Sequence, residues 1–240
     1  MKIIGIIPAR YASTRFPGKP LASIMGKTMI KRVYYQCLKS IYLDNLIVAT
    51  DDERIYNEVK SFRGNVIMTS TEHLNGTSRC AEAISKLPEK YDYVINIQGD
   101  EPLIHPEQID TLGKIFFKDA DIEIATLVKK ETDVSLLENR HIVKAIVNKQ
   151  FFAVDFKREL TTTENFLYKH IGIYGFQTNI LQELVQLAPS ENEIKYQLEQ
   201  LRWLDNGYRI KAGLTEHESI SVDVPEEVEK IEQVLKISNY

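Results

Sequence analysis

The chain has few cysteines and no long apolar stretch. Cys37 and Cys80 are the only cysteines in 240 residues, and their spacing fits no metal-binding or redox motif. No apolar run is long enough to cross a bilayer, and the strand-like N-terminus has no signal-peptide pattern. We therefore expect a cytoplasmic protein with no membrane partner, whose two cysteines are small core residues.

Two common nucleotide-binding motifs are also absent. No Gly-x-Gly occurs anywhere, which excludes the dinucleotide-binding fingerprint. Residues 26–28 (GKT) imitate the end of a P-loop, but Leu21 stands where that motif requires its first glycine. The formal net charge of -4 argues against nucleic acid as a partner.

The first half of the chain alternates short apolar runs with helical patterns. Hydrophobic residues make up 43% and charged residues 27%, which is ordinary for a soluble globular protein. The pattern predicts strands at 3–7, 46–49, 66–68 and 93–97, and helices at 27–40, 52–61 and 76–87. Such alternation predicts an α/β fold with a doubly wound, mostly parallel sheet.

The alternation weakens after about residue 120. Strands are expected at 122–128, 142–147, 168–176, 208–214 and 219–222, helices at 178–187 and 193–206, and a final helix with Pro225 in its first turn. We interpret the chain as a single domain in three parts. They are an α/β part (1–120), an inserted β-rich lobe (121–215), and a return strand with a C-terminal helix (216–240).

A basic loop follows the first predicted strand. Residues 8–20 (PARYASTRFPGKP) contain the cations Arg10, Arg15 and Lys19. Ligands of open α/β sheets bind beyond the carboxyl ends of the strands, and arginine and lysine suit phosphate oxygens. The loop therefore predicts a polyanion site, the alternative being a solvated loop that touches no ligand.

Two aspartates lie at other strand ends. Asp100 belongs to residues 98–102 (QGDEP), and Asp223 precedes the final helix. Magnesium prefers one or two carboxylates together with phosphate oxygens and water. Either aspartate could supply a carboxylate ligand. The alternatives are a turn or capping role for Asp100 and a helix N-cap for Asp223.

Seven motifs together resemble one known family. They lie at residues 8–21, 49–52, 68–70, 76–79, 96–102, 169–174 and 198–202. The chain resembles 3-deoxy-manno-octulosonate cytidylyltransferase, the CMP-KDO synthetase family, nearly from end to end. The resemblance implies a nucleotidyltransferase fold, a homodimer, and Mg²⁺-dependent conversion of CTP and KDO to CMP-KDO and diphosphate for lipopolysaccharide or capsule synthesis.

The resemblance also implies roles for particular residues. The implied catalytic residues are Arg10, Lys19, Asp100 and Asp223, of which Asp100 and Asp223 hold the metal. The implied CTP-binding residues are Pro8, Ala9, Arg10, Ser13, Arg15, Lys19, Arg79 and Gln98. The implied sugar-binding residues are Gln98, Arg158, His170, Tyr174, Glu199 and Gln200. Taken singly, His170 and Tyr174 could equally be strand core residues, and Glu199 an exposed helix residue.

The chain departs from the family pattern mainly in residues 121–215, the lobe for which the resemblance implies sugar binding and dimerisation. The usual Tyr-Phe-Ser-Arg segment reads DFKR at residues 155–158, and the linker from Arg158 to His170 is shorter. Ser78 stands where the family has an acidic residue, and Tyr196 where it has a glutamate. The acceptor therefore stays open between KDO and a related acidic 2-keto sugar, such as 8-amino-KDO or a sialic-acid-like sugar.

The expected reaction is in-line attack by the sugar's anomeric hydroxyl on the α-phosphorus of CTP. Positioning and charge neutralisation supply most of the catalysis in such transfers, and no protein general base is evident. A second alternative is a non-catalytic nucleotide-binding paralogue. Release of diphosphate would separate an enzyme from such a binding protein.

Overall fold

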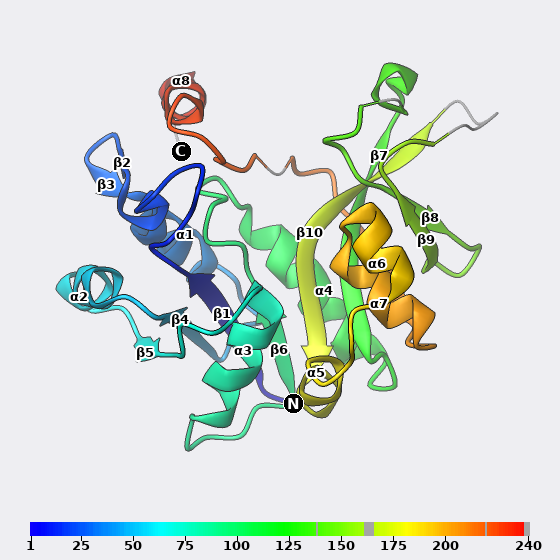
Figure 1. Cartoon of the computed structure of the whole chain (residues 1–240), viewed down its shortest axis with the longest axis horizontal. Helices are drawn as coiled ribbons and strands as arrows, with labels where there is room; N and C mark the ends of the chain where they lie inside the picture. The colour runs from blue at the N-terminus through cyan, green and yellow to red at the C-terminus, as the bar shows by residue number, and fades with distance from the viewer. Residues whose placement is uncertain (138, 161–165, 219, 238–240) are drawn as a thin grey trace. The chain divides into compact units, whose positions relative to one another are not determined.

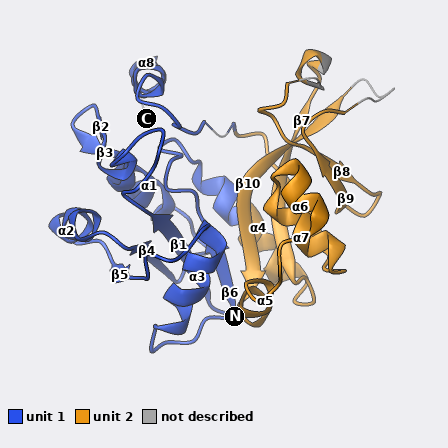
Figure 2. Cartoon of the chain, in the orientation of Figure 1, with its two compact units in different colours: residues 1–110, 218–240 blue, residues 111–217 orange. Residues whose placement is uncertain are grey.

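The computed structural model describes residues 1–137, 139–160, 166–218 and 220–237. The chain folds into two compact units, which Figure 2 colours separately. Unit 1 comprises residues 1–110 and 218–240, and unit 2 comprises residues 111–217. The sugar and dimer functions that the sequence assigned to residues 121–215 stay predictions.

Unit 1 contains four parallel strands in the order β5-β4-β1-β6 (Figure 1). Strand β1 (Ile3–Ala9) pairs with β4 (Asn45–Thr50) on one side and β6 (Tyr93–Asn96) on the other, and β5 (Val66–Met68) pairs with β4. β1 is continuously apolar because it is central, and Ile4, Ile6 and Ile7 are fully buried. The predicted α/β fold is confirmed.

Helices α1 (Met29–Cys37), α2 (Glu53–Ser61) and α3 (Gly76–Ser85) connect these strands. Asp52 caps α2 by accepting a hydrogen bond from the Arg54 N–H, and Asn75 caps α3 by accepting one from the Ser78 N–H. Cys37 and Cys80 are buried within these helices, as predicted. The sequence pattern did not reveal α4 (Pro106–Lys118), which runs across the boundary between the units.

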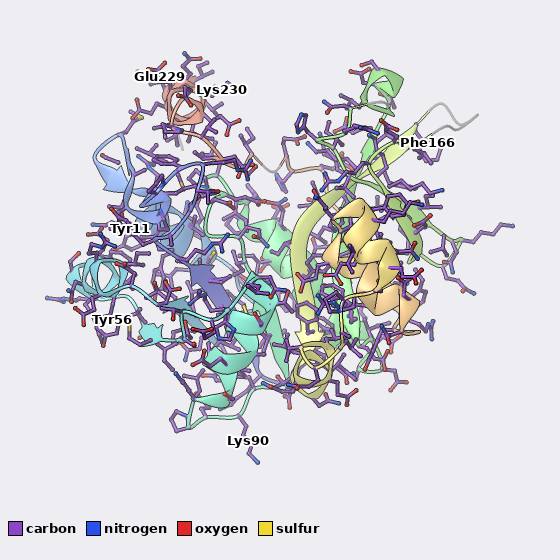
Figure 3. All side chains as sticks on the ribbon, in the orientation of Figure 1. Tyr11, Tyr56, Lys90, Phe166, Glu229 and Lys230 are labelled. Atoms are coloured by element: carbon purple, nitrogen blue, oxygen red, sulfur yellow. The ribbon has the colours of Figure 1, made fainter. Side chains whose placement is uncertain are left out.

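The C-terminal helix belongs to unit 1. Helix α8 (Glu227–Ile237) buries Ile231 in a cluster with Ile24, Met29, Leu103 and Val222. On its other face, Glu229 and Lys230 point into solvent (Figure 3). The helix begins two residues after Pro225, and residues 220–222 form no strand, while Ser219 lies outside the described residues. Ile24 belongs to the short β2 (Ser23–Ile24), which pairs with β3 (Lys27–Thr28).

Unit 2 contains a mixed sheet in the order β10-β7-β11-β9-β8. Its strands are β7 (Ile124–Glu131), β8 (Lys144–Val147), β9 (Phe152–Lys157), β10 (Leu167–Gln177) and β11 (Ile210–Leu214). β11 runs parallel to β7, and the other pairs are antiparallel. The remaining elements are η2 (Val134–Leu137), α5 (Thr178–Leu184), α6 (Glu191–Tyr196) and α7 (Glu199–Asp205).

The single helix predicted at 193–206 is wrong, because the chain breaks there into α6 and α7. Gln197 takes a left-handed conformation with φ of 54° and ends α6. The Arg158 guanidinium stabilises this break by donating hydrogen bonds at 3.1 Å to the carbonyls of Tyr196 and Gln197. A partner distant in the sequence thus decides where the helix ends, which helical periodicity does not reveal.

Candidate nucleotide and metal site

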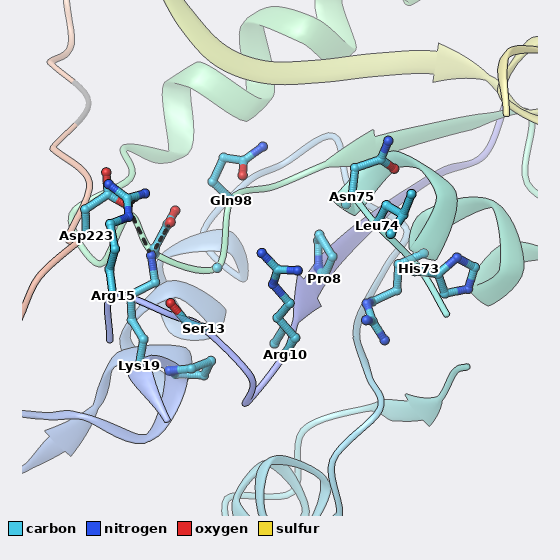
Figure 4. Close-up of a pocket in the computed structure, with 16 residues that line it drawn as sticks. Pro8, Arg10, Ser13, Arg15, Lys19, His73, Leu74, Asn75, Gln98 and Asp223 are labelled. Carbon is cyan, nitrogen blue, oxygen red and sulfur yellow. Dashed lines mark hydrogen bonds and ion pairs between the residues drawn. The ribbon is translucent and has the colours of Figure 1, made fainter. Parts of the chain in front are cut away.

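A cavity of about 250 Å³ lies in unit 1, beyond the carboxyl ends of β1 and β6 (Figure 4). It is lined by every predicted CTP-binding residue and by both predicted metal ligands: Pro8, Ala9, Arg10, Ser13, Arg15, Lys19, Arg79, Gln98, Asp100 and Asp223. The structure therefore brings these residues together around one space. Their individual roles stay predictions.

The basic loop folds back on itself before it reaches Lys19. The Gly18 N–H donates to the Tyr11 carbonyl at 2.9 Å, and Gly18 has a φ of 72°, which favours glycine. A Cβ on Gly18 would lie 2.9 Å from the Tyr11 ring. That ring in turn stacks under Arg54 of α2, at 3.3 Å from the guanidinium carbon to the ring centre (Figure 3 labels Tyr11). The short helix η1 (Lys19–Leu21) follows at once and fixes the backbone of Lys19.

Gly99 allows the loop after β6 to approach β1 closely. A Cβ at this position would lie 2.9 Å from the Pro8 carbonyl oxygen, so a larger residue would push the two loops apart. The next residue, Asp100, accepts a hydrogen bond at 2.9 Å on its carbonyl from the Val222 N–H. This bond joins the loop after β6 to the C-terminal segment and brings Asp100 and Asp223 to the same side of the cavity.

The two carboxylates converge on one ammonium group. Lys19 Nζ lies 2.6 Å from Asp100 Oδ2 and 3.5 Å from Asp223 Oδ1 (Figure 4). Arg15 Nη2 contacts the same Asp223 oxygen at 3.0 Å. Two hard carboxylate oxygens that already share a cation are a donor set suited to Mg²⁺, so these residues fit the predicted metal.

Arg10 differs from the other cations of the loop. Its guanidinium projects into the cavity (Figure 4). Among the described residues, it has no ion-pair or hydrogen-bond partner. Its donors are therefore available for phosphate oxygens.

Arg79 is buried and already occupied. It is 3% exposed, Nη2 donates to Asp51 Oδ2 at 2.7 Å, and Nη1 donates to the Thr69 hydroxyl at 2.7 Å and the Ser70 carbonyl at 3.2 Å. The guanidinium therefore holds the segment after β5 and the turn after β4 in place at the cavity wall. The structure shows this positioning contact, and the nucleotide contact of Arg79 stays a prediction.

Three residues that the sequence did not predict also line the cavity beside α3: His73, Leu74 and Asn75. The His73 Nε2 contacts the Glu82 carboxylate. Burial raises the pKa of Glu82, but hydrogen bonds from Lys86, the Ser70 N–H and His73 outweigh it and hold the pKa at about 2. The N-cap position of Asn75, between a strand end and a helix, was the sequence signal that could have placed this segment at the cavity.

In unit 2, His170 and Tyr174 lie in an aromatic cluster. The His170 ring packs against Phe156 and Tyr174, and the Tyr174 ring against Trp203, with centroid distances of 5.0, 5.4 and 5.0 Å. His170 Nε2 lies 3.0 Å from the Thr126 hydroxyl, and burial lowers the pKa of His170 to about 3. Burial also raises the pKa of Tyr174 well above its usual value. Tyr174 is thus a buried core residue, which the sequence had left as an alternative, whereas His170 packs on the same rings and is partly exposed.

The other predicted sugar residues of unit 2 lie in different surroundings. Gln200 is buried in α7, and Glu199 is the first residue of that helix. Arg158 lines a separate cavity of about 760 Å³, where its guanidinium donates to the carbonyls of Arg140, Tyr196 and Gln197. Three of its donors are therefore already used by the backbone.

The altered segment 155–158 borders the same cavity. Asp155 and Lys157 pair with each other at 3.3 Å, and their side chains are 39% and 48% exposed. This is the solvent-facing pair that strand alternation allows. Part of the shortened linker, residues 161–165, lies outside the described residues.

Comparisons with known proteins relate nearly the whole chain to cytidylyltransferases. The family model described as cytidylyltransferase matches residues 4–212. A 3-deoxy-manno-octulosonate cytidylyltransferase from Parabacteroides distasonis is 53% identical over 245 residues and covers 96% of each chain. One from Fusobacterium nucleatum is 48% identical over 244 residues and covers 100% of this chain and 99% of the relative.

Two solved structures are similar to this chain in fold. A CMP:2-keto-3-deoxy-manno-octonic acid synthetase complexed with CTP matches with a TM-score of 0.93 at 36% identity, covering 98% of this chain and 99% of the other. A cytidylyltransferase from Leptospira borgpetersenii has a TM-score of 0.68 at 18% identity, covers 98% and 87%, and shares the fold alone. Within the part of the chain that the structure describes, no helix has both the length and the apolar character of a membrane span.

Proposed function

The chain belongs to the 3-deoxy-manno-octulosonate cytidylyltransferase family, and from this we propose that it couples CTP to the anomeric hydroxyl of KDO, giving CMP-KDO and diphosphate. The observation that carries the proposal is the unit 1 cavity. Its lining combines the cations predicted to bind the triphosphate with a pair of converging carboxylates. The chain is 53% identical to a 3-deoxy-manno-octulosonate cytidylyltransferase.

The basic loop supplies the groups that hold a triphosphate. Arg10 projects a guanidinium without a partner among the described residues, and Lys19 and Arg15 lie together beside Asp223 (Figure 4). These cations would offset negative charge on the β- and γ-phosphates as diphosphate leaves. Gly18 and η1 position the backbone of Lys19 before the nucleotide binds.

Asp100 and Asp223 would hold the magnesium ion. When bound, the metal would neutralise phosphate charge and lower the pKa of the attacking hydroxyl. The cavity walls contribute orientation: Arg79 holds the segment after β5, and the backbone bond from Val222 to Asp100 holds together the two segments that carry the carboxylates.

We also propose that the protein works in the cytoplasm as a homodimer and supplies CMP-KDO for lipopolysaccharide or capsule synthesis. Its partners are then CTP and an acidic 2-keto-3-deoxy sugar. Light scattering of the purified chain tests the dimer: a mass near twice 27.7 kDa supports it, and a mass near 27.7 kDa contradicts it.

An acceptor panel with CTP and Mg²⁺ tests the reaction. We expect diphosphate release with KDO and little release without an acceptor. Faster release with 8-amino-KDO or a sialic-acid-like sugar would replace KDO as the acceptor and leave cytidylyl transfer intact. No release with any acidic sugar, together with measurable CTP binding, would identify a nucleotide-binding paralogue instead.

A further inference from the structure

Lys19 occupies the point at which the carboxylates of the cavity converge. Its ammonium lies 2.6 Å from Asp100 and 3.5 Å from Asp223, and its side chain is only 15% exposed. In the proposed function this ammonium binds the triphosphate, and the same two carboxylates bind a divalent cation. Both cations cannot lie between these carboxylates at once, because they would repel each other at contact distance.

The backbone around this group is fixed, whereas the ammonium is on a long stem. The Lys19 N–H donates to the Phe16 carbonyl at 3.2 Å, and its carbonyl accepts from the Ala22 N–H at 3.0 Å. Asp100 is tied through its carbonyl to Val222, and the Asp223 N–H donates to Glu227 Oε2 at 2.7 Å. A change of partner therefore requires only rotation of the Lys19 side chain, while both carboxylates stay in place.

We propose that the Lys19 ammonium and a divalent cation exclude each other from the Asp100–Asp223 pair, and that a nucleoside triphosphate relieves this exclusion by taking Lys19 onto its phosphate oxygens. The inference rests on the proposed function. It makes metal binding weak without the nucleotide and strong with it. By thermodynamic reciprocity, the metal strengthens nucleotide binding by the same factor.

Arg15 gives an internal comparison. Its guanidinium contacts Asp223 at 3.0 Å but is not paired with Asp100, and its side chain is 65% exposed. Solvent screens an exposed pair, so Arg15 competes with a metal less than Lys19 does. The structure thus predicts an order of effects, with removal of Lys19 strengthening metal binding more than removal of Arg15.

Calorimetric titration with Mn²⁺ alone, without nucleotide, tests the exchange. We expect Lys19→Met to bind Mn²⁺ at least about tenfold more tightly than the unaltered chain, because it removes a contacting positive charge. Arg15→Met should give a smaller gain. Lys27→Met, which removes an exposed cation of β3 away from the cavity lining, should give none.

Two further variants keep the test decisive. Lys19→Arg keeps a cation and should leave Mn²⁺ binding weak, and Lys19→Met combined with Asp100→Asn should lose the gained affinity. Thermal unfolding of each variant shows that it is folded. Equal Mn²⁺ affinity in folded Lys19→Met and the unaltered chain overturns the proposal, as does a gain that persists in the double variant. Diphosphate release by the unaltered chain tests the proposed function separately, so either idea can fail alone.

Discussion

The guanidinium of Arg79 in α3 donates a 2.7 Å hydrogen bond to the carboxylate of Asp51, which follows β4. The pair is nearly enclosed, with side chains 3% and 14% exposed. A second nitrogen of the same guanidinium reaches Thr69 after β5. One side chain therefore ties two strand ends to the helix that borders the cavity, and a lysine could not reach both partners at once.

Removing Arg79 should destabilise unit 1. We expect Arg79→Met to lower the free energy of unfolding by about 3 kcal/mol, because it leaves the Asp51 carboxylate enclosed without its partner. Arg79→Lys should lose less. Urea unfolding measures both, and Lys2→Met, which breaks an exposed pair with Glu89, should lower the free energy of unfolding far less than Arg79→Met does. Equal losses for Arg79→Met and Lys2→Met would show that the Arg79 pair is not structural.

Lys19→Ala should weaken the binding of CTP more than that of CMP. The ammonium is proposed to contact the outer phosphates, which CMP lacks. Calorimetric titration with each nucleotide in the presence of Mg²⁺ gives the two affinities. If both fall by the same factor, Lys19 does not read the triphosphate end.

Asp100→Asn should reduce turnover by more than about a hundredfold while leaving the fold intact. The substitution removes a charged metal ligand but keeps the size of the side chain, and a contact that stabilises transition-state charge is worth at least this factor. Diphosphate release measures turnover, and thermal unfolding confirms the fold. A near-normal rate would rule out Asp100 as a metal ligand.

The partly buried His170 should make the free energy of unfolding fall as the pH drops. Its pKa is lowered to about 3 in the folded chain, whereas in the unfolded chain it takes a proton below about pH 6.5. Between pH 6.5 and pH 3 the unfolded state therefore binds more protons than the folded state. The contribution of His170 to the free energy of unfolding is present above pH 6.5 and is lost towards pH 3.

Comparison with His170→Gln isolates this contribution, since the other four histidines are present in both proteins. We expect the unaltered chain to lose roughly 1–2 kcal/mol more than the variant between pH 7 and pH 5. Urea unfolding at several pH values gives the difference. Parallel curves for the two proteins would mean that His170 titrates normally.

Asp155→Tyr should change kcat/KM for KDO by less than about threefold. Asp155 pairs with Lys157 on an exposed strand face, so its charge is already neutralised and screened. The same variant should leave the ratio of kcat/KM for KDO and 8-amino-KDO unchanged. A clear shift of that ratio would show that Asp155 faces the acceptor, as the sequence departure had left open.

The sequence predicted which residues gather around the unit 1 cavity because the signals for these residues are local. A buried apolar run followed by polar residues specifies both the strand and the loop, so β1, Lys19 and Asp100 could be placed from adjacent residues. The contact between Lys19 and Asp223 could not be predicted from the sequence. The two residues are 204 positions apart in the chain, and only the folded structure brings them together.

Unit 2 was harder to predict because distant contacts override its local patterns. Arg158 was expected among the sugar-binding residues, and that role stays a prediction. In the structure it donates to three backbone carbonyls, two of them at the break that divides the predicted helix. His170 has the residue type of a site residue, yet it is surrounded by aromatic rings. Residue type and spacing alone cannot distinguish these surroundings.

The hydrogen bond from the Val222 N–H to the Asp100 carbonyl also sets when the site can form during translation. A ribosome makes the basic loop and Asp100 early, but Asp223 only after all of unit 2. A nascent or truncated chain that ends at residue 217 has Lys19 and Asp100 but neither Val222 nor the second carboxylate. The proposed metal site is therefore completed last, and such a shortened chain lacks one of its two proposed carboxylate ligands.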